Sequence, residues 1–326
     1  MLEVRLTEAG PRSARAEIVR ILEPSPYRIV PECPVYARCG GCDFQHITYE
    51  EELWAKISRL NDALRRIAKV PVQASEILSD GQIFGYRNKA VFHSDGTKRG
   101  FYAARSKDIV PIGRCLLLKD DINDALKDLP DGREITLRCG KNGLAPPPEE
   151  ELDGIVFAIS GFFQVNTGAA LLLYKKAREY AAMRDSEMLI DLYCGVGSLT
   201  LFIGRDAGRA LGVEINTDAV KAARGNARRN GYSHIEFIAS DAEKWETETV
   251  QADCVVVDPP RRGLSRGAVR KILGLSPKRI VYVSCDPATL ARDLRALEGY
   301  AVKEVCAVDM FPRTANVECC CLLAHG

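Results

Sequence analysis

Two predicted strands of this sequence end in residues that could carry out catalysis. The first is the apolar run 279–284, which Cys285 follows directly, just before a predicted helix at 288–297. A thiol beside a helix N-terminus meets a dipole that favours the thiolate, so Cys285 is the strongest candidate nucleophile. The second is Cys254 to Val257, which leads into Asp258 and two prolines that constrain the backbone around its carboxylate. Carboxyl ends of parallel strands are where such sheets carry their sites. A buried, inert thiol is the alternative interpretation of Cys285.

A second group of thiols lies near the start of the chain. Cys33, Cys39 and Cys42 form the pattern Cys-x5-Cys-Gly-Gly-Cys, whose glycines let the backbone fold around a ligand. Such spacing in a chain with reduced cysteines favours a metal site over disulfides. Cys115 is the best candidate for a fourth ligand, and Cys139 is the next. Four thiolates suit zinc as well as an iron-sulfur cluster, but the paired C-x2–4-C spacing usual for zinc is absent. Buried free cysteines are the remaining alternative.

A glycine turn between a strand and a helix predicts a nucleoside pocket. The apolar run from Leu189 closes on Asp191 and turns through Gly195 and Gly197, and the next predicted strand ends in Glu214, where an acid can accept hydrogen bonds from ribose hydroxyls. The third glycine of a dinucleotide fingerprint is replaced by Thr200, so no pyrophosphate is expected. This pattern resembles the S-adenosylmethionine (SAM) pocket of class I methyltransferases. An ordinary strand-helix corner is the alternative.

From Gly161 onward the pattern alternates between strands and helices, which predicts a mainly parallel sheet. The closing pair of strands indicates that the last one is antiparallel. The fold class is therefore predicted as α/β with seven strands. The strands are expected at 189–191, 210–213, 235–239, 254–257, 279–284, 301–309 and 317–323, and the helices at 169–183, 217–230, 265–273 and 288–297.

The first half of the chain has a different organisation. A linker with three prolines predicts a domain boundary near residue 30. Thr48 to Glu51 has the form of a capping box ahead of apolar residues at helical spacing, so residues 49–69 are expected to form an amphipathic helix. Its Lys56, Arg59, Arg65 and Arg66 are expected on the solvated face. The other elements predicted are strands at 2–6 and 14–22, antiparallel strands over 83–115 with a hairpin tip at 95–100, a helix at 120–129 and a strand at 134–138.

Composition limits the class of protein. The 326 residues suffice for two sizeable cores, and no apolar run reaches the ~20 residues that span a bilayer. With no secretory leader pattern at the start, the twelve cysteines are expected to be reduced thiols or metal ligands in the cytoplasm. The net charge of +1 does not indicate a nucleic-acid partner, but Arg261 to Lys271 holds five basic residues and no acid, which suits phosphates. Solvated helix faces explain single clusters of this kind more often.

Six spaced motifs together resemble the RNA uracil-5 methyltransferase family, which makes 5-methyluridine in tRNA and 23S rRNA. The resemblance covers residues 31–326 and implies an iron-sulfur and RNA-binding domain at 31–160 and a SAM-dependent methyltransferase domain at 161–326. Residues 1–22, within a first segment 1–30, resemble the end of an RNA-binding TRAM barrel, most of which is missing. Asn316 stands where the family usually has histidine. The motifs are Cys-x5-Cys-Gly-Gly-Cys, Phe-x-Gln-x-Asn, Asp-Leu-Tyr-Cys-Gly-Val-Gly, Asp-Pro-Pro-Arg-Arg-Gly, Ser-Cys-Asp-Pro and Phe-Pro-x-Thr-x-x-Val-Glu.

The resemblance also implies a mechanism and a set of site residues. Cys285 adds to carbon 6 of uracil, carbon 5 then takes the methyl group of SAM, and Glu318 removes the carbon 5 proton. Phe162 stacks on a flipped-out uridine. The substrate is expected in 23S rRNA, or in tRNA, and the protein is expected to be a monomer with no membrane contact. The SAM and uracil pockets are expected to use Gln164, Tyr193, Ser198, Glu214, Asp241 and Asp258, and a 4Fe-4S cluster is expected on Cys33, Cys39, Cys42 and Cys115.

Two other functions fit parts of this pattern. An RNA cytosine-5 methyltransferase would use the same thiol addition, although that class draws its base and nucleophile from different motifs. An iron-sulfur RNA-binding redox sensor that has lost turnover would keep the cluster, but the presence of Cys285, Glu318 and the SAM loop argues against it. Analysis of the modified base separates the first alternative, and any turnover excludes the second.

Overall fold

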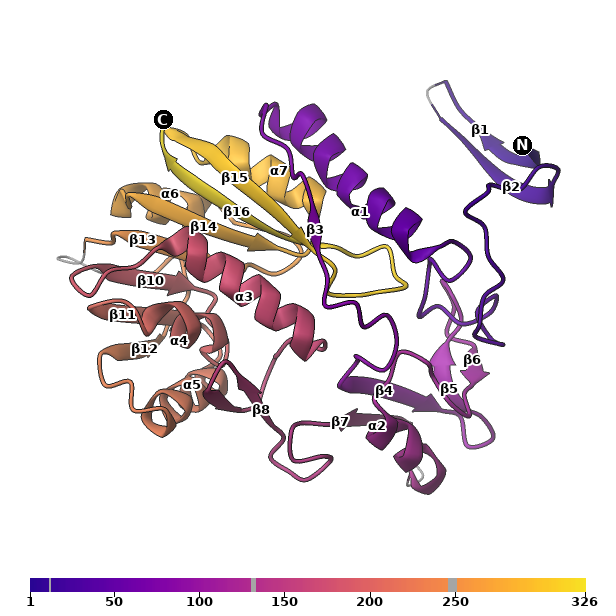
Figure 1. Cartoon of the computed structure of the whole chain (residues 1–326), viewed down its shortest axis with the longest axis horizontal. Helices are drawn as coiled ribbons and strands as arrows, with labels where there is room; N and C mark the ends of the chain where they lie inside the picture. The colour runs from indigo at the N-terminus through magenta and orange to yellow at the C-terminus, as the bar shows by residue number, and fades with distance from the viewer. Residues whose placement is uncertain (12, 130–132, 246–250) are drawn as a thin grey trace.

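A large mixed sheet organises the chain (Figure 1). The computed structural model describes residues 1–326 except 12, 130–132 and 246–250. Five neighbouring strands are parallel, and β16 runs antiparallel to both β14 and β15, which confirms the predicted antiparallel last strand. The order across the sheet is β12 (Ile235–Ala239), β11 (Arg209–Glu214), β10 (Met188–Leu192), β13 (Cys254–Val257), β14 (Arg279–Ser284), β16 (Glu318–His325), β15 (Tyr300–Val308) and β3 (Ile77–Leu78).

The prediction of seven strands is confirmed for residues 161–326, where they are β10 to β16, but the sheet contains one strand more. The eighth strand, β3, comes from the first half of the chain and pairs in parallel with Ala307 and Val308 of β15 at the sheet edge. A strand of two residues has no alternation to detect, and its pairing joins segments far apart in the sequence. The first half of the chain therefore contributes one edge strand to the sheet of the second half, and the division at residue 160 stays a prediction.

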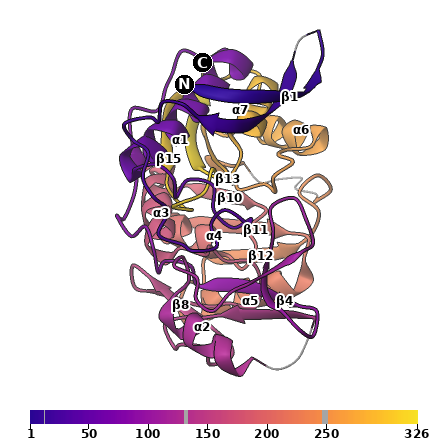
Figure 2. The ribbon, with the colours of Figure 1, turned by 90° about the vertical axis from the view of Figure 1, so that its right-hand side faces the viewer.

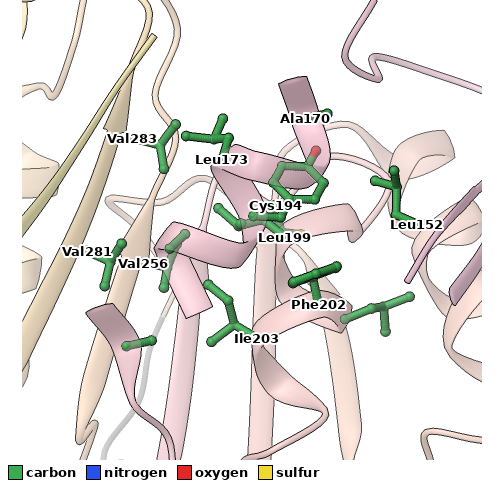
Figure 3. Close-up of a cluster of buried hydrophobic side chains, with 14 of the residues drawn as sticks. Leu152, Ala170, Leu173, Cys194, Leu199, Phe202, Ile203, Val256, Val281 and Val283 are labelled. Carbon is green, nitrogen blue, oxygen red and sulfur yellow. The ribbon is translucent and has the colours of Figure 1, made fainter. Parts of the chain in front are cut away.

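Alternate strand residues pack on opposite faces of the sheet, as expected for strands buried on both sides. Val256 joins one apolar core beneath α3 (Thr167–Ala181), α4 (Ser198–Gly204) and α5 (Thr217–Arg229), part of which Figure 3 shows. Val255 and Val257 join the core on the other face. That second face is covered by α1 (Tyr49–Ala63), α6 (Arg266–Leu275) and α7 (Pro287–Ala296).

The helix at the start of the middle region is confirmed, but its predicted solvated face is partly wrong. Thr48 caps α1 by accepting a hydrogen bond from the Glu51 amide, and a π-helical turn, 64–68, continues the helix. Lys56 is buried, and its ammonium group lies 2.7 Å from Glu52 and 2.6 Å from Asp309. Two carboxylates from different elements compensate the cost of burying this charge. Local periodicity could not reveal that pairing.

The remaining strands form three small sheets. β1 (Leu2–Ala9) and β2 (Ala14–Ile21) form an exposed hairpin that lies apart from the other elements (Figures 1 and 2), and the TRAM assignment of this segment stays a prediction. β4 (Lys89–Ser94), β5 (Arg99–Tyr102), β6 (Ile109–Pro111) and β7 (Glu134–Arg138) form the predicted antiparallel sheet, next to α2 (Asp120–Ala125) and the short 3-10 helix Leu126–Asp128. The hairpin of β8 (Glu149–Leu152) and β9 (Ile155–Ala158) was not predicted.

Two further expectations concern the whole chain. All twelve cysteines are free thiols. Among the described residues, no helix is both long and apolar enough to cross a membrane.

Candidate functional site

A cavity of about 380 Å³, here called the strand-end cavity, opens at the carboxyl edge of the sheet. Parallel strands β10, β13 and β14 end there and place Asp191, Asp258 and Cys285 around it. Because β16 runs the opposite way, its first residue, Glu318, reaches the same edge. The cavity is lined by Phe162, Gln164, Tyr174, Asp191, Tyr193, Cys194, Gly195, Val196, Ser198, Leu199, Asp258, Pro259, Pro260, Arg261, Cys285, Phe311, Asn316 and Glu318.

The predicted glycine turn forms one wall of this cavity. Gly197 has a φ of 81°, and a Cβ there would lie 2.8 Å from the Phe237 ring, so only glycine fits without rearrangement. Thr200, which replaces the third glycine of a dinucleotide motif, donates a 2.5 Å hydrogen bond to Oδ2 of Asp191. The turn therefore exposes backbone to a ligand while its helix anchors a buried acid.

That acid leaves one acceptor free for a ligand. Oδ1 of Asp191 is buried and has no hydrogen-bond partner among the described residues. Burial raises the pKa of Asp191 to about 8. A buried acceptor without a donor is costly, and a cationic donor beside a carboxyl group would lower its pKa again. The cavity thus fits a ligand that carries an ammonium group.

Cys285 lies in this cavity, but its thiol does not have the lowered pKa that its position before a helix predicts. The pKa of Cys285 is raised to about 11, mainly by burial. The nearby charges of Glu318 and Asp258 also raise this pKa, and their effect outweighs the lowering by Arg261. Burial and the neighbouring negative charges therefore outweigh the expected effect of the following helix. In this state the thiol keeps its proton, so nucleophilic attack requires a base.

Two further carboxyl groups in the cavity, besides Asp191, have raised pKa values. Burial, together with the charge of Asp258, raises the pKa of Glu318 to about 8, although Arg261 opposes the change. Burial raises the pKa of Asp258 to about 7. Groups with pKa values near neutrality suit general acid-base catalysis, because they exchange protons readily at physiological pH. A thiol and two such acids around one cavity match the chemistry of a covalent catalyst.

The other predicted site residues divide into two sets. Phe162, Gln164, Tyr193 and Ser198 line the cavity, whereas Glu214 and Asp241 do not. Glu214 accepts hydrogen bonds from the backbone amides of Gly195, at 3.1 Å, and Asn216, at 2.8 Å, so it borders the glycine turn. Asp241 accepts a hydrogen bond from the Glu243 amide, at 2.9 Å.

Several lining residues were not predicted as site residues. Tyr174 is buried in α3 and exchanges a 3.0 Å hydrogen bond with the Ser198 hydroxyl, while Phe311 precedes β16. Asn316 lines the cavity too. The sequence offers one signal for this residue, because the family usually has histidine at this position. Tyr174 carries no such signal, because its spacing is that of any core residue of a helix.

A second cavity, of about 300 Å³, brings together the cysteines of the first half. Cys33, Cys39, Cys42 and Cys115 all line this thiol cavity. Cys139 is not among the lining residues and its thiol lies 3.1 Å from Oδ2 of Asp121. Burial is the main cause that raises the pKa of Cys42 to about 12, with the neighbouring thiols adding to the effect.

The thiols surround one cavity but do not form a finished coordination site. Within the described parts of the chain, no group of three or more His, Cys, Asp or Glu side chains is arranged to hold a metal ion. Both the predicted set of ligands and the metal itself therefore stay predictions. Four thiols with no competing carboxylate are a donor set that fits a thiophilic cluster or ion.

Comparisons with known proteins identify the family. The family model for tRNA (uracil-5-)-methyltransferase matches residues 157–326. An uncharacterized RNA methyltransferase of Bacillus cereus is 33% identical over an alignment 417 positions long, gaps included, which covers 99% of this chain and 89% of the relative. This chain belongs to the tRNA (uracil-5-)-methyltransferase family. It is accordingly an RNA (uracil-5-)-methyltransferase, and the family resemblance predicted from its motifs is confirmed.

Other relatives of the methyltransferase agree. An uncharacterized RNA methyltransferase of Halalkalibacterium halodurans is 33% identical and aligns with 92% of this chain and 84% of its own. The crystal structure of Pyrococcus abyssi tRNA (uracil-54, C5)-methyltransferase in complex with S-adenosyl-L-homocysteine is similar across 99% of this chain and 92% of that one, with 26% identity and a TM-score of 0.77. Similarity over this length confirms the α/β fold predicted for residues 161–326.

Proposed function

We propose that this methyltransferase transfers the methyl group of SAM to carbon 5 of a uridine in RNA, through a covalent bond between Cys285 and uracil. The observation that carries the proposal is the convergence of Cys285, Asp258 and Glu318 on one cavity. The similar Pyrococcus abyssi enzyme was crystallised with S-adenosyl-L-homocysteine, the product of SAM. The free Oδ1 atom of Asp191 suits the ammonium group of SAM. When bound, SAM supplies the electrophilic methyl group.

The first step is addition of the thiol to the uracil ring. The Cys285 proton must leave before its sulfur attacks carbon 6, and the Asp258 carboxylate, which lines the same cavity, is the proposed acceptor of this proton. The new carbon–sulfur bond moves the ring electrons into an enolate, which makes carbon 5 nucleophilic. Carbon 5 then takes the methyl group.

The second step releases the product. Glu318, in its carboxylate form, takes the proton from carbon 5, the double bond between carbons 5 and 6 forms again, and the Cys285 sulfur leaves. Burial keeps the pKa of Glu318 at about 8, which makes it a stronger base than a solvated carboxylate. The two residues thus have distinct tasks, so their variants should stop the reaction at different points.

The RNA would approach over an aromatic and basic rim. Phe162 lines the strand-end cavity with 71% of its surface exposed, which leaves its ring free to stack on a flipped-out uracil. Arg261 lines the same cavity, and Arg262, the next residue in the chain, is exposed. Cations next to the cavity can neutralise phosphates of the flanking nucleotides. The RNA is proposed to be 23S rRNA or tRNA, in the cytoplasm.

The test is the identity of the modified base. The purified protein, supplied with SAM bearing an isotopic label in its methyl group, should form labelled 5-methyluridine in unmodified 23S rRNA or tRNA, measured by mass spectrometry of nucleosides. Labelled 5-methylcytidine would assign the cytosine activity, and no product in either RNA would contradict the proposal. Mapping 5-methyluridine in RNA from cells with and without the gene then identifies the position.

For the thiol cavity we propose a 4Fe-4S cluster held by Cys33, Cys39, Cys42 and Cys115. The four thiols line one cavity, and uracil methylation needs no electron, so the proposed role is to organise the surrounding fold. Protein purified without oxygen should contain iron and sulfide. Zinc without iron in such a preparation would contradict the cluster. Cys115→Ala should lower the iron content, whereas Cys139→Ala should not.

A further inference from the structure

The segment that precedes Glu318 is held almost entirely by the first half of the chain. Residues 311–317, here called the approach loop, form most of the connection between β15 and β16 and contribute Phe311 and Asn316 to the strand-end cavity. The backbone of this loop determines where Glu318 begins β16. Its hydrogen-bond partners therefore bear on the position of the proposed base.

The beginning of the approach loop is fixed by buried groups. The Lys56 ammonium donates to the Phe311 carbonyl at 3.1 Å, and the Tyr86 hydroxyl donates to the Pro312 carbonyl at 2.9 Å. The Arg313 amide donates to the Glu52 carboxylate at 2.7 Å. These contacts lie in the core, where a substitution would leave buried charge without a partner and would destabilise the fold.

The end of the approach loop is fixed by two exposed residues. The Ala315 amide donates to Oδ2 of Asp43 at 2.8 Å, and the Ala315 carbonyl accepts from Nη1 of Arg59 at 2.9 Å. The two side chains thus hold both polar groups of one residue, three positions before Glu318. The backbone amides of Asp43 and Phe44 also donate to the Arg313 carbonyl.

Arg59 contacts the other catalytic segment as well. Its Nη2 lies 3.5 Å from Oδ2 of Asp286, the residue after Cys285, whose side chain caps α7 by accepting from the Thr289 amide. One guanidinium group on α1 therefore joins the backbone that leads to Glu318 to the residue beside Cys285. Asp43 follows Cys42 in the sequence, so the thiol cavity borders the same set of contacts.

We propose that Asp43 and Arg59 are positioning residues for methyl transfer: they hold the approach loop so that Glu318 and Cys285 face the same uracil. The inference rests on the proposed roles of those two residues. Reacting groups displaced by about 1 Å can lose on the order of a hundredfold in rate, which is why two exposed contacts can matter to catalysis. Their effect on stability is small, because exposed ion pairs contribute little and the Arg59 side chain is 49% exposed.

The experiment compares Asp43→Ala and Arg59→Ala with a matched control, Arg66→Ala. Arg66 lies in the π-helical turn that continues the same helix, and its guanidinium group lies 3.3 Å from the carboxylate of Asp62. The single-turnover rate of methyl transfer, the Kd for RNA and hydrogen exchange of the 311–317 amides are measured for each folded variant. Both test variants should lose about tenfold or more in rate with Kd changed less than about twofold, and exchange should accelerate in the approach loop. The control should match the wild type.

Conservative variants separate positioning from general damage. Asp43→Asn keeps an acceptor oxygen for the Ala315 amide, so it should recover most of the rate that Asp43→Ala loses. Rates like that of the wild type in both alanine variants, or equal loss in Arg66→Ala, would overturn the inference. If the wild type itself makes no 5-methyluridine, the proposed function fails instead, and accelerated exchange in the approach loop would still report the contacts.

Discussion

The strand-end cavity and the thiol cavity are of similar size and both contain half-buried cysteines, yet they are built in different ways. The first is formed where neighbouring strands of one sheet end, so the order of the strands brings its residues together. The second is formed where a loop, residues 33–42, and the segment around Cys115 pack against β4 and β5 of the small antiparallel sheet. Sheet topology thus determines the first, and loop packing determines the second.

The two cavities also differ in the groups around their thiols. Cys285 faces Glu318 and Asp258, which can move protons, whereas Cys42 faces three other thiols, which can bind a metal. Burial raises the pKa of both thiols, so burial alone does not decide their chemistry. The neighbours decide it: the same side chain is proposed as a nucleophile in one place and as a ligand in the other.

The largest expected effect comes from removing the thiol of the strand-end cavity. Cys285→Ala should lower methyl transfer by about a thousandfold or more, because carbon 5 of uracil is a poor nucleophile without the sulfur adduct. SAM binding, measured by calorimetry, and iron content should stay near wild type, since neither depends on this thiol. Turnover within about tenfold of wild type, a barrier difference of only ~1.4 kcal/mol, would exclude covalent catalysis.

Replacing the base should stop the reaction one step later. In Glu318→Gln the sulfur can still add and the methyl group can still transfer, but the carbon 5 proton has no acceptor and the enzyme should remain bound to RNA. Denaturing gels should show a slow band that retains labelled methyl groups and is absent from the double variant with Cys285→Ala. Release of methylated RNA at the normal rate by a folded variant would remove Glu318 from the mechanism.

Removing a thiol of the other cavity should give the opposite result. Cys42→Ala should lower the iron content of anaerobically purified protein, while methyl transfer in the folded fraction should fall less than about tenfold, since no catalytic step uses this thiol. The two measurements on Cys42→Ala and Cys285→Ala form a cross-comparison. Loss of iron in Cys285→Ala, or full iron in Cys42→Ala, would break the distinction between the cavities.

The last expected effect is on folding stability as a function of pH and not on the reaction. Burial raises the pKa of Glu318 from 4.5 to about 8 in the folded state, so the folded protein binds this proton more tightly than the unfolded chain. The associated stability is fully present below pH about 4.5 and is lost as pH rises through about 8. Between pH 5 and 9, wild type should lose more unfolding free energy than Glu318→Gln, on the order of a few kcal/mol. If urea unfolding shows that the two proteins lose the same unfolding free energy between pH 5 and 9, this prediction is wrong.

The sequence by itself determined the elements and the ends of the strands. The spacing of apolar residues located the parallel strands and the helices of the second half. Cys285 and Asp258 each follow a parallel strand directly, so the sequence alone places both at the carboxyl edge of the sheet. Spacing also sufficed to group Cys33, Cys39 and Cys42, because residues so close in the chain share a loop. These inferences depend on local order, which sequence patterns record.

Only the tertiary structure decided which distant segments meet. Lys56 looked like a solvated residue of its helix, but it is buried against Asp309, 253 residues away. The pairing of β3 with the sheet edge, the raised pKa of Cys285 and the contacts of Asp43 and Arg59 with Ala315 arise in the same way. Each depends on burial and hydrogen bonding between elements far apart in the chain. The local spacing of apolar residues contains no information about such contacts.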